Sequence, residues 1–301
     1  MAKPTSGVTT EVDGRVITLS NLDKALYPSG FTKAQVIDYH VRVADAYVAH
    51  LRGRAVTFKR FPDGTAHPGF FEKRCPRHRP EWVGVALGPG DRRGGIEYCC
   101  VESRAALVWA GNMAALEIHA PMALAVDLDC PRSVVFDLDP GPGTTVVECC
   151  QVALEVREVL DAVGLAGWCK TSGSKGLQLY VPLNLPGVRH EDASRFALAC
   201  GQVLERRRPA RVTTVMAKAA RPGKVFVDWS QNSFHKTTIA PYSLRARPEP
   251  TVSTPVGWDE VEACAASDLE LRFDAAEVIA RVVERGDLFA PVLTTEQVLP
   301  G

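Results

Sequence analysis

The sequence lacks any long apolar segment. No run of about 18 or more uncharged apolar residues, the length that a membrane-spanning helix needs, occurs among its 301 residues. Residues 1–6 also lack the apolar stretch of a secretory signal. These absences argue against a membrane protein and a secreted protein, and we expect a cytoplasmic one.

Cysteine spacings typical of metal sites are missing too. The nine cysteines include two adjacent pairs, Cys99-Cys100 and Cys149-Cys150, which lie inside apolar runs, but no Cys-x-x-Cys motif. An odd number of cysteines cannot pair completely within one chain. We therefore expect buried free thiols rather than disulfides or a zinc site.

The chain has no net charge, since 35 basic residues balance 35 acidic ones. A neutral protein has no overall attraction to a polyanion. The balance conceals an alternation, because residues 1–80 and 171–250 are rich in basic side chains, whereas 81–170 and 251–301 are rich in acidic ones. If the two basic blocks meet in space, they could neutralise several phosphates. Ordinary solvated surface is the other interpretation.

An apolar fraction of 46% supplies a substantial core for one large domain or two small ones. We find no internal repeat and no low-complexity segment. Strand and helix patterns alternate, which predicts an α/β or α+β fold. We expect helices at residues 32–51, 103–116, 144–163, 191–206 and 275–286, and strands at 55–61, 96–101, 133–139, 168–171, 177–183, 212–216, 225–230 and 237–240. Residues 62–95 and the proline-rich stretch 247–255 are expected to be loop and linker.

The sharpest chemical feature is an apolar strand that ends in two carboxylates. Residues 133–143 read Ser-Val-Val-Phe-Asp-Leu-Asp-Pro-Gly-Pro-Gly. Because strand side chains alternate, Asp137 and Asp139 project from one face about 7 Å apart. Such a pair can bind hard divalent cations, although a structural role stays open. A second Asp-Leu-Asp, at 127–129, follows no comparable strand, so the tripeptide alone is weak evidence.

A third carboxylate, Asp228, ends the apolar strand 224–228 at a position that a core would not choose. Three strand-end aspartates can hold the two metal ions of nucleotidyl transfer. Between these strands, residues 171–176 are small and rich in hydroxyl groups, with one lysine. They suit a phosphate cradle, although an ordinary turn is the alternative and the Walker spacing is absent. Nearby cations could complete a wall around a triphosphate: Arg221, Lys224, Lys236 and Arg245.

Longer strings in the sequence resemble the polymerase domain of bacterial DNA ligase D, a branch of the archaeo-eukaryotic primase superfamily that acts in non-homologous end joining. The resemblance rests on residues 19–28, 59–60, 70–73, 135–141, 171–177 and 224–245. It implies one primase-polymerase domain over residues 1–301, with central mixed and antiparallel sheets flanked by helices. Within it, residues 1–120 would contact DNA, 121–250 would form the catalytic part, and 251–301 a linker and a helix.

The resemblance also implies an activity. Such a domain adds nucleotides, often ribonucleotides, to DNA ends and short gaps that bear a 5′ phosphate, and it uses two Mn²⁺ or Mg²⁺ ions. Its partners would be DNA, nucleoside triphosphates, Ku and a separate DNA ligase, without a membrane. We expect a monomer at the bacterial nucleoid. A start at Met1 and the lack of a Lys-x-Asp-Gly ligase signature favour a stand-alone form.

Matching positions carry over residue roles from the family. The catalytic metal ligands would be Asp137, Asp139 and Asp228. The incoming nucleotide would be bound by Lys59, Phe71, His119, Ser172, Lys175, Gln178, Arg221, Gln231 and Arg245, with Phe71 stacking on its base. The DNA would be bound by Asn21, Lys24 and Lys33, and the two lysines would form a 5′-phosphate pocket.

One residue departs from the family pattern, because Gln178 stands where the family has histidine. Glutamine can donate and accept hydrogen bonds, but it cannot become a cation near neutral pH. A catalytically weakened DNA-end-binding paralogue therefore stays open, as does a metal-dependent nuclease on the same carboxylates. The intact set of three aspartates favours retained polymerase activity, since positioning and metals supply most phosphoryl-transfer catalysis.

Overall fold

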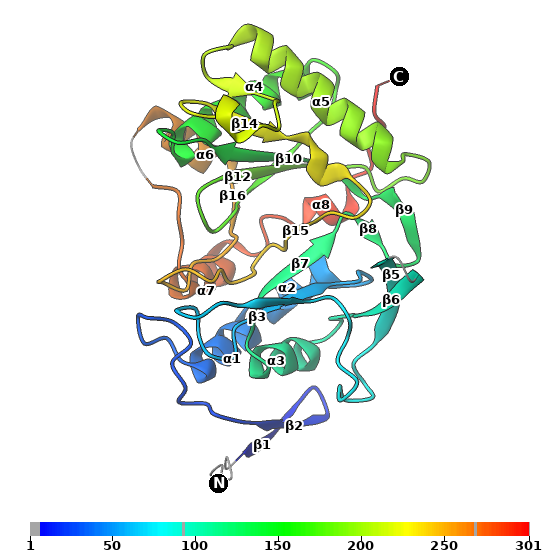
Figure 1. Ribbon diagram of the computed structural model, residues 1–301, viewed down its shortest axis with the longest axis vertical. Helices are drawn as coiled ribbons and strands as arrows, with labels where there is room; N and C mark the ends of the chain where they lie inside the picture. The colour runs from blue at the N-terminus through cyan, green and yellow to red at the C-terminus, as the bar shows by residue number, and fades with distance from the viewer. Residues whose placement is uncertain (1–6, 92–93, 268–269, 301) are drawn as a thin grey trace.

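Two β-sheets form the framework of the protein (Figure 1). The computed structural model describes residues 7–91, 94–267 and 270–300. The larger sheet has the strand order β13-β14-β10-β12-β11-β16, and the smaller one has the order β15-β7-β3-β4. The pairing of β13 with β14 is parallel, and the other pairings within these two sheets are antiparallel. The predicted mixture of helices with mixed and antiparallel sheets is confirmed.

The strands have the following bounds. The larger sheet contains β13 (Val212–Thr213), β14 (Val225–Asp228), β10 (Ser133–Pro140), β12 (Leu177–Pro182), β11 (Trp168–Thr171) and β16 (Pro255–Val256). The smaller sheet contains β15 (Thr237–Ile239), β7 (Ala115–Pro121), β3 (Thr57–Arg60) and β4 (Phe70–Glu72). Three hairpins pair β1 (Val8–Val12) with β2 (Arg15–Leu19), β5 (Val85–Asp91) with β6 (Gly94–Cys99), and β8 (Ala123–Leu124) with β9 (Asp127–Pro131).

Helices cover both sheets. They are α1 (Lys33–Arg42), α2 (Ala44–Leu51), α3 (Arg104–Asn112), α4 (Val146–Asp161), α5 (His190–Arg207), α6 (Trp258–Ala266), α7 (Ala275–Arg285) and α8 (Pro291–Thr294), with 3₁₀ turns η1 (Lys218–Ala220) and η2 (Trp229–Asn232). In Figure 1, α4 and α5 lie over the larger sheet and α1 to α3 flank the smaller one. Within the described residues, no helix has the length and apolar character to cross a membrane.

Alternation along β10 decides which face carries the carboxylates. Val134, Phe136 and Leu138 are fully buried in a core cluster with the apolar face of α4 and part of α5. The intervening positions therefore project from the opposite face. Asp137 and Asp139 lie on that face, which leaves them clear of the helices.

Two predicted helices differ from the structure. The helix expected over residues 32–51 begins after Thr32, whose side chain and that of Gln35 form a reciprocal cap, but it is interrupted at Val43. Val43 has a φ of −101° and a ψ of 4°, and its side chain is buried in the core. The helix expected to reach residue 116 ends at Asn112, because Ala114 takes a positive φ of 56° and the chain enters β7.

Loop predictions were wrong in two places. Residues 62–95 include β4 and β5, and pairing with β3 and β6 forms these strands despite a sequence rich in turn residues. The proline-rich stretch 247–255 is not an exposed linker at its end, because residues 251–254 are buried and β16 follows at Pro255. Contacts with distant segments, rather than local pattern, produce both differences.

The cysteine prediction was wrong for one pair. Cys75 and Cys99 form a disulfide with Cα atoms 4.8 Å apart. The backbone N–H of Cys75 donates to Glu97 O, which draws the loop against β6 and brings the two sulfurs together. Cys149, Cys150 and Cys169 are buried thiols, as predicted.

Candidate active site

A row of polar side chains crosses one face of the larger sheet. Asp137 of β10 lies opposite Asp228 of β14 on one side and opposite Gln178 of β12 on the other. Gln178 in turn lies opposite Lys170 of β11. Directly opposed residues share a face, and Asp139 lies two residues further along the same face of β10. The three predicted carboxylates therefore come together.

These carboxylates repel one another in a buried setting. Asp137 is 7% exposed and Asp228 is 8% exposed. Burial, reinforced by the charge on Asp139 and that on Asp228, raises the pKa of Asp137 to about 7. Burial and Asp228 also raise the pKa of Asp139. Oxygen donors that are costly to ionise together fit a site for hard divalent cations.

The carboxylates do not form a complete set of metal ligands in this structure. Among the described residues, no three Asp, Glu, His or Cys side chains are grouped closely enough to hold one ion. Asp228 Oδ1 accepts hydrogen bonds from Ser230 N at 3.0 Å and Ser230 Oγ at 2.6 Å. In this structure the Asp228 carboxylate is therefore held by Ser230.

Gln178 is held at its oxygen end by a buried lysine. Lys170 is fully buried, and its Nζ donates to Gln178 Oε1 at 2.6 Å and to Ser253 Oγ at 2.7 Å. Burial lowers the pKa of Lys170 well below its usual value. The Gln178 side chain, which lies opposite Asp137, opposes the rise in the pKa of that carboxyl. The sequence interpretation missed Lys170, although a lysine inside an apolar strand is itself a signal.

A cavity of about 460 Å³ opens beside this row. Asp137 and Asp139 line it, and so do seven of the predicted nucleotide-binding residues, namely His119, Ser172, Lys175, Gln178, Arg221, Gln231 and Arg245. Ser172 Oγ accepts hydrogen bonds from the backbone N–H of Ser174 at 3.3 Å and of Gly176 at 3.0 Å. A Cβ at Gly176 would lie 2.4 Å from Leu138 O, so only glycine fits where this loop meets β10.

Lys59 and Phe71 lie at the rim of the cavity rather than in its lining. Lys59 Nζ is 5.4 Å from the centroid of the Phe71 ring, and the Phe71 and His119 ring centroids are 5.5 Å apart. Phe71 is 59% exposed. One face of its ring is therefore available for stacking on a planar group.

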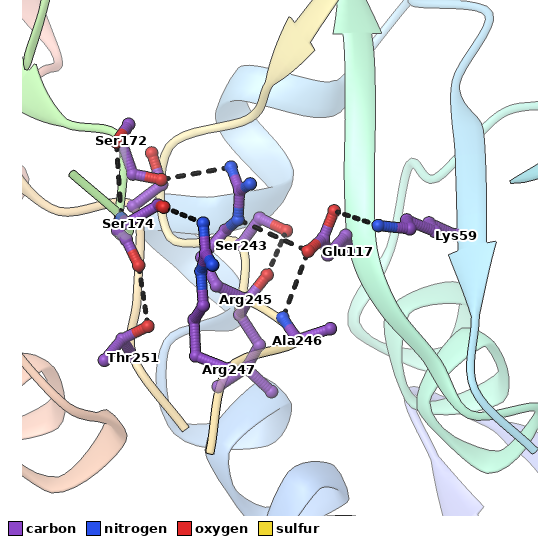
Figure 2. A network of polar contacts seen from close by, with 12 residues as sticks. Lys59, Glu117, Ser172, Ser174, Ser243, Arg245, Ala246, Arg247 and Thr251 are labelled. Atoms are coloured by element: carbon purple, nitrogen blue, oxygen red, sulfur yellow. Dashed lines mark hydrogen bonds and ion pairs between the residues drawn. The ribbon is translucent and has the colours of Figure 1, made fainter. Parts of the chain in front are cut away.

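A buried carboxylate that the sequence interpretation missed joins several of these residues (Figure 2). Glu117 of β7 is 3% exposed. Its Oε2 lies 3.0 Å from His119 Nε2 and 3.8 Å from Lys59 Nζ, and its Oε1 lies 3.3 Å from Arg245 Nε. Burial alone would raise its pKa, but His119, Arg245 and the N–H of Ala246 lower the pKa of Glu117 to about 2. The alternation of Glu117, Ile118 and His119 is typical of a strand and could have indicated this residue. It was overlooked because a helix was expected to end at residue 116, directly before it.

The same network reaches the loop at residues 172–176. Arg245 Nη1 donates to Ser172 O at 3.1 Å, and Arg247 donates to the hydroxyl of Ser174. Thr251 Oγ1 donates to Gly173 O at 2.6 Å. Figure 2 shows Arg245 and Arg247 between Ser172 and Ser174 of the loop and Glu117, with Thr251 below the loop.

The three residues predicted to bind DNA form a separate group. Lys24 N donates to Asn21 O at 3.1 Å, and Lys33 N donates to Lys24 O at 2.9 Å. Burial, Lys24 and Arg60 together lower the pKa of Lys33. Two neighbouring ammonium groups suit an anion. None of the three residues lines the cavity.

Comparisons with known proteins identify the family of this chain. A family model described as "LigD, primase-polymerase domain" matches residues 32–289. The multifunctional non-homologous end joining protein LigD of Mycolicibacterium smegmatis is 45% identical over 92% of the chain, and the bifunctional LigD of Bacillus subtilis is 31% identical over 90%. The chain spans 36% and 43% of the lengths of these two relatives.

A solved structure is similar as well. The polymerase domain from Mycobacterium tuberculosis ligase D in complex with DNA superposes with a TM-score of 0.84 and is 42% identical in sequence. The match covers 92% of this chain and 98% of that one. The likeness thus extends over nearly the whole of both folds.

Proposed function

Because the chain belongs to the LigD primase-polymerase family, it is a polymerase-type nucleotidyltransferase domain, and we propose that it adds nucleotides to DNA ends and short gaps in non-homologous end joining. One observation carries this proposal: Asp137 and Asp139 line the same cavity as Lys175, Arg221 and Arg245. A nucleoside triphosphate with divalent cations is complementary to a wall that carries carboxylates on one part and cations on another. A simple nuclease would need no such cationic part.

Asp137, Asp139 and Asp228 would hold two Mn²⁺ or Mg²⁺ ions. When bound, such ions activate the 3′ hydroxyl and neutralise charge on the triphosphate and on the leaving pyrophosphate. The raised pKa of Asp137 supports this role, because a cation would offset the burial and the repulsion by Asp139 and Asp228 that raise it. Gln178 lies opposite Asp137 and opposes the rise in its pKa, while Lys170 holds the amide oxygen of Gln178.

The remaining cavity residues would position the nucleotide. The loop at residues 172–176 and Lys175 would bind its phosphates, together with Arg221, Gln231 and Arg245. The exposed ring of Phe71 would stack on the base, with Lys59 and His119 beside it. Holding the phosphates and the base at once aligns the reacting phosphorus with the primer end.

DNA is the proposed macromolecular partner. The ligase D polymerase domain that this chain resembles was solved in complex with DNA. In this chain, Asn21, Lys24 and Lys33 would contact the duplex, and the two lysines would take a 5′ phosphate. We further propose a monomer at the bacterial nucleoid that works with Ku and a DNA ligase.

Gln178 supports a second candidate function, a catalytically weakened relative that binds DNA ends. The residue accepts a hydrogen bond from Lys170 and lies opposite Asp137, but it cannot supply a positive charge. Such a protein would bind nucleotide and DNA without efficient turnover.

Incorporation of labelled ATP and dATP into a one-nucleotide gap with a 5′ phosphate tests both functions. We expect template-matched incorporation by the native chain with Mn²⁺ or Mg²⁺, and a loss of about a thousandfold or more in Asp137→Ala, since metal binding contributes several kcal/mol to the transition state. Asp127→Ala is the matched control, because Asp127 begins the other Asp-Leu-Asp in the exposed strand β9.

The result with Gln178→His separates the two functions. Activity in this variant but none in the native chain would establish the weakened relative. No activity in either protein would sink the polymerase assignment.

A further inference from the structure

Glu117 places a negative charge beside a cavity that we propose takes a polyanion. The residue is 3% exposed, and in the described structure it has no part in the row that carries Asp137. A carboxylate near a triphosphate repels it. We therefore expect Glu117 to make a favourable contribution that outweighs this repulsion.

The geometry of Glu117 divides its two oxygens between different partners. Oε1 accepts a hydrogen bond from Ala246 N at 3.0 Å and pairs with Arg245 Nε at 3.3 Å. Oε2 accepts from His119 Nε2 at 3.0 Å and faces Lys59 Nζ at 3.8 Å. Three of the side chains assigned to the nucleotide thus converge on one carboxylate.

Register reinforces these contacts. Glu117 lies directly opposite Lys59 in the pairing of β7 with β3, and Lys59 lies directly opposite Phe71 in the pairing of β3 with β4. The carboxylate, the ammonium group and the aromatic ring therefore form a row across the smaller sheet. Its end at Phe71 is the proposed base-stacking position.

Arg245 connects this row to the larger sheet. Its guanidinium pairs with Glu117 through Nε and donates to Ser172 O through Nη1 at 3.1 Å. One guanidinium therefore makes an ion pair with Glu117 and a hydrogen bond to the loop at the same time. The carboxylate on one sheet is thus linked to the phosphate loop on the other, as Figure 2 shows.

We propose that Glu117 is a positioning residue for the incoming nucleotide, which holds Lys59, His119 and Arg245 ready for the base and the phosphates without touching the nucleotide itself. This inference rests on the proposed function. Without the carboxylate, the three cationic or ionisable groups would repel one another and take up other rotamers. Ordering them again on binding would weaken the affinity for nucleotide.

The role of His119 follows from the same contact. Because Nε2 donates to Glu117, Nδ1 is the ring nitrogen left for other partners. The carboxylate therefore selects the tautomer that the cavity presents.

The first experiment compares Glu117→Gln with the native chain. Glutamine keeps the shape and removes the charge. We expect the KM for nucleotide, and the Kd for a non-hydrolysable ATP analogue with Mn²⁺, to rise about tenfold or more, and kcat to change much less. Glu72→Gln is the matched control, since Glu72 of β4 pairs with Arg60 of β3 at 3.0 Å in the same sheet without lining the cavity. We expect native KM and Kd in that variant.

A double-variant cycle distinguishes positioning from general support of the fold. If Glu117 acts through Arg245, adding Glu117→Gln to Arg245→Ala should raise the Kd for the analogue less than it does in the native chain. Fully additive effects would contradict the proposal. Binding of gapped DNA without nucleotide should stay native in each single variant, because the proposed 5′-phosphate group lies elsewhere.

Other outcomes are equally decisive. Native KM and Kd in Glu117→Gln, with activity abolished by Asp137→Ala, would overturn this inference and leave the proposed function standing. A native chain that neither binds the analogue nor incorporates nucleotide would overturn both. If Glu117→Gln fails to fold, Glu117→Asp replaces it, because aspartate keeps the charge on a shorter side chain. We then expect a smaller rise in the Kd for the analogue. A native Kd in that variant would refute the positioning role of Glu117.

Discussion

Two buried carboxylates, one on each sheet, behave in opposite ways. Asp137 of β10 is 7% exposed and Glu117 of β7 is 3% exposed. Burial and its acidic neighbours raise the pKa of Asp137 to about 7, whereas His119 and Arg245 lower the pKa of Glu117 to about 2 against the effect of burial. Burial disfavours the charged form in both cases, so the partners decide the direction.

The difference lies in how each carboxylate reaches a cation. Glu117 contacts Lys59 and Arg245 directly. Asp137 faces two other carboxylates, and Gln178 lies between it and Lys170, whose own pKa is lowered by burial. The smaller sheet therefore carries a charge network that is complete within the protein. The larger sheet carries one that added cations would complete, as the proposed metal site requires.

The largest effect should come from changing each carboxylate to its amide in protein prepared without divalent cations. At pH 8 we expect Glu117→Gln to lower the free energy of unfolding by about 3 kcal/mol, because it leaves the partly buried cations Lys59 and Arg245 without the carboxylate that they share. We expect Asp137→Asn to raise it by about 1–3 kcal/mol, because it removes repulsion. Urea unfolding measures both. If both variants changed the free energy of unfolding in the same direction, the contrast between Glu117 and Asp137 would be wrong.

The second prediction concerns pH. The pKa of Asp137 in the folded protein, about 7, exceeds the value of about 4 expected for an unfolded chain. The folded state therefore binds this proton more tightly than the unfolded chain does. The contribution of Asp137 to the free energy of unfolding is at its maximum below about pH 4 and is lost as the pH rises through about 7. Urea unfolding of the cation-free native chain should show this loss, and Asp137→Asn should not.

Added Mn²⁺ provides the control for that experiment. At pH 8 it should raise the Tm of the native chain and raise that of Asp137→Asn much less, since a ligand stabilises only the state that binds it. An equal rise in the Tm of both proteins would mean that the stabilising ion binds at a site that does not include Asp137.

The smallest effect should come from an exposed carboxylate. Asp63 pairs with Lys24 at 3.3 Å, but its side chain is 75% exposed. We expect Asp63→Asn to change the free energy of unfolding by less than about 0.5 kcal/mol, because solvent screens such pairs. Binding of DNA with a 5′ phosphate should strengthen by a few fold at low salt, since the carboxylate no longer competes for Lys24. Anisotropy titrations at two salt concentrations measure this change.

Local pattern was sufficient for part of the fold and part of the site. The strand that ends in Asp137 and Asp139 was predicted because an apolar run and a glycine-rich turn lie within a few residues of each other. The helix starts after Thr32 and Thr145 follow from capping side chains three residues away. The end of the first helix was not predictable in this way, because Val43 packs into the core against residues distant in the chain.

The sequence by itself determined the mixed α/β class, the carboxylate-bearing strands and, through its resemblance to the ligase D polymerase domain, the candidate residues. Only the tertiary structure decided that Glu117 meets Arg245, that Lys170 holds Gln178, that β15 joins the smaller sheet and that Cys75 pairs with Cys99. Periodicity and capping act over one or two turns of chain, whereas these contacts depend on strand register and on packing between sheets. Neither strand register nor packing between sheets can be predicted from local sequence patterns.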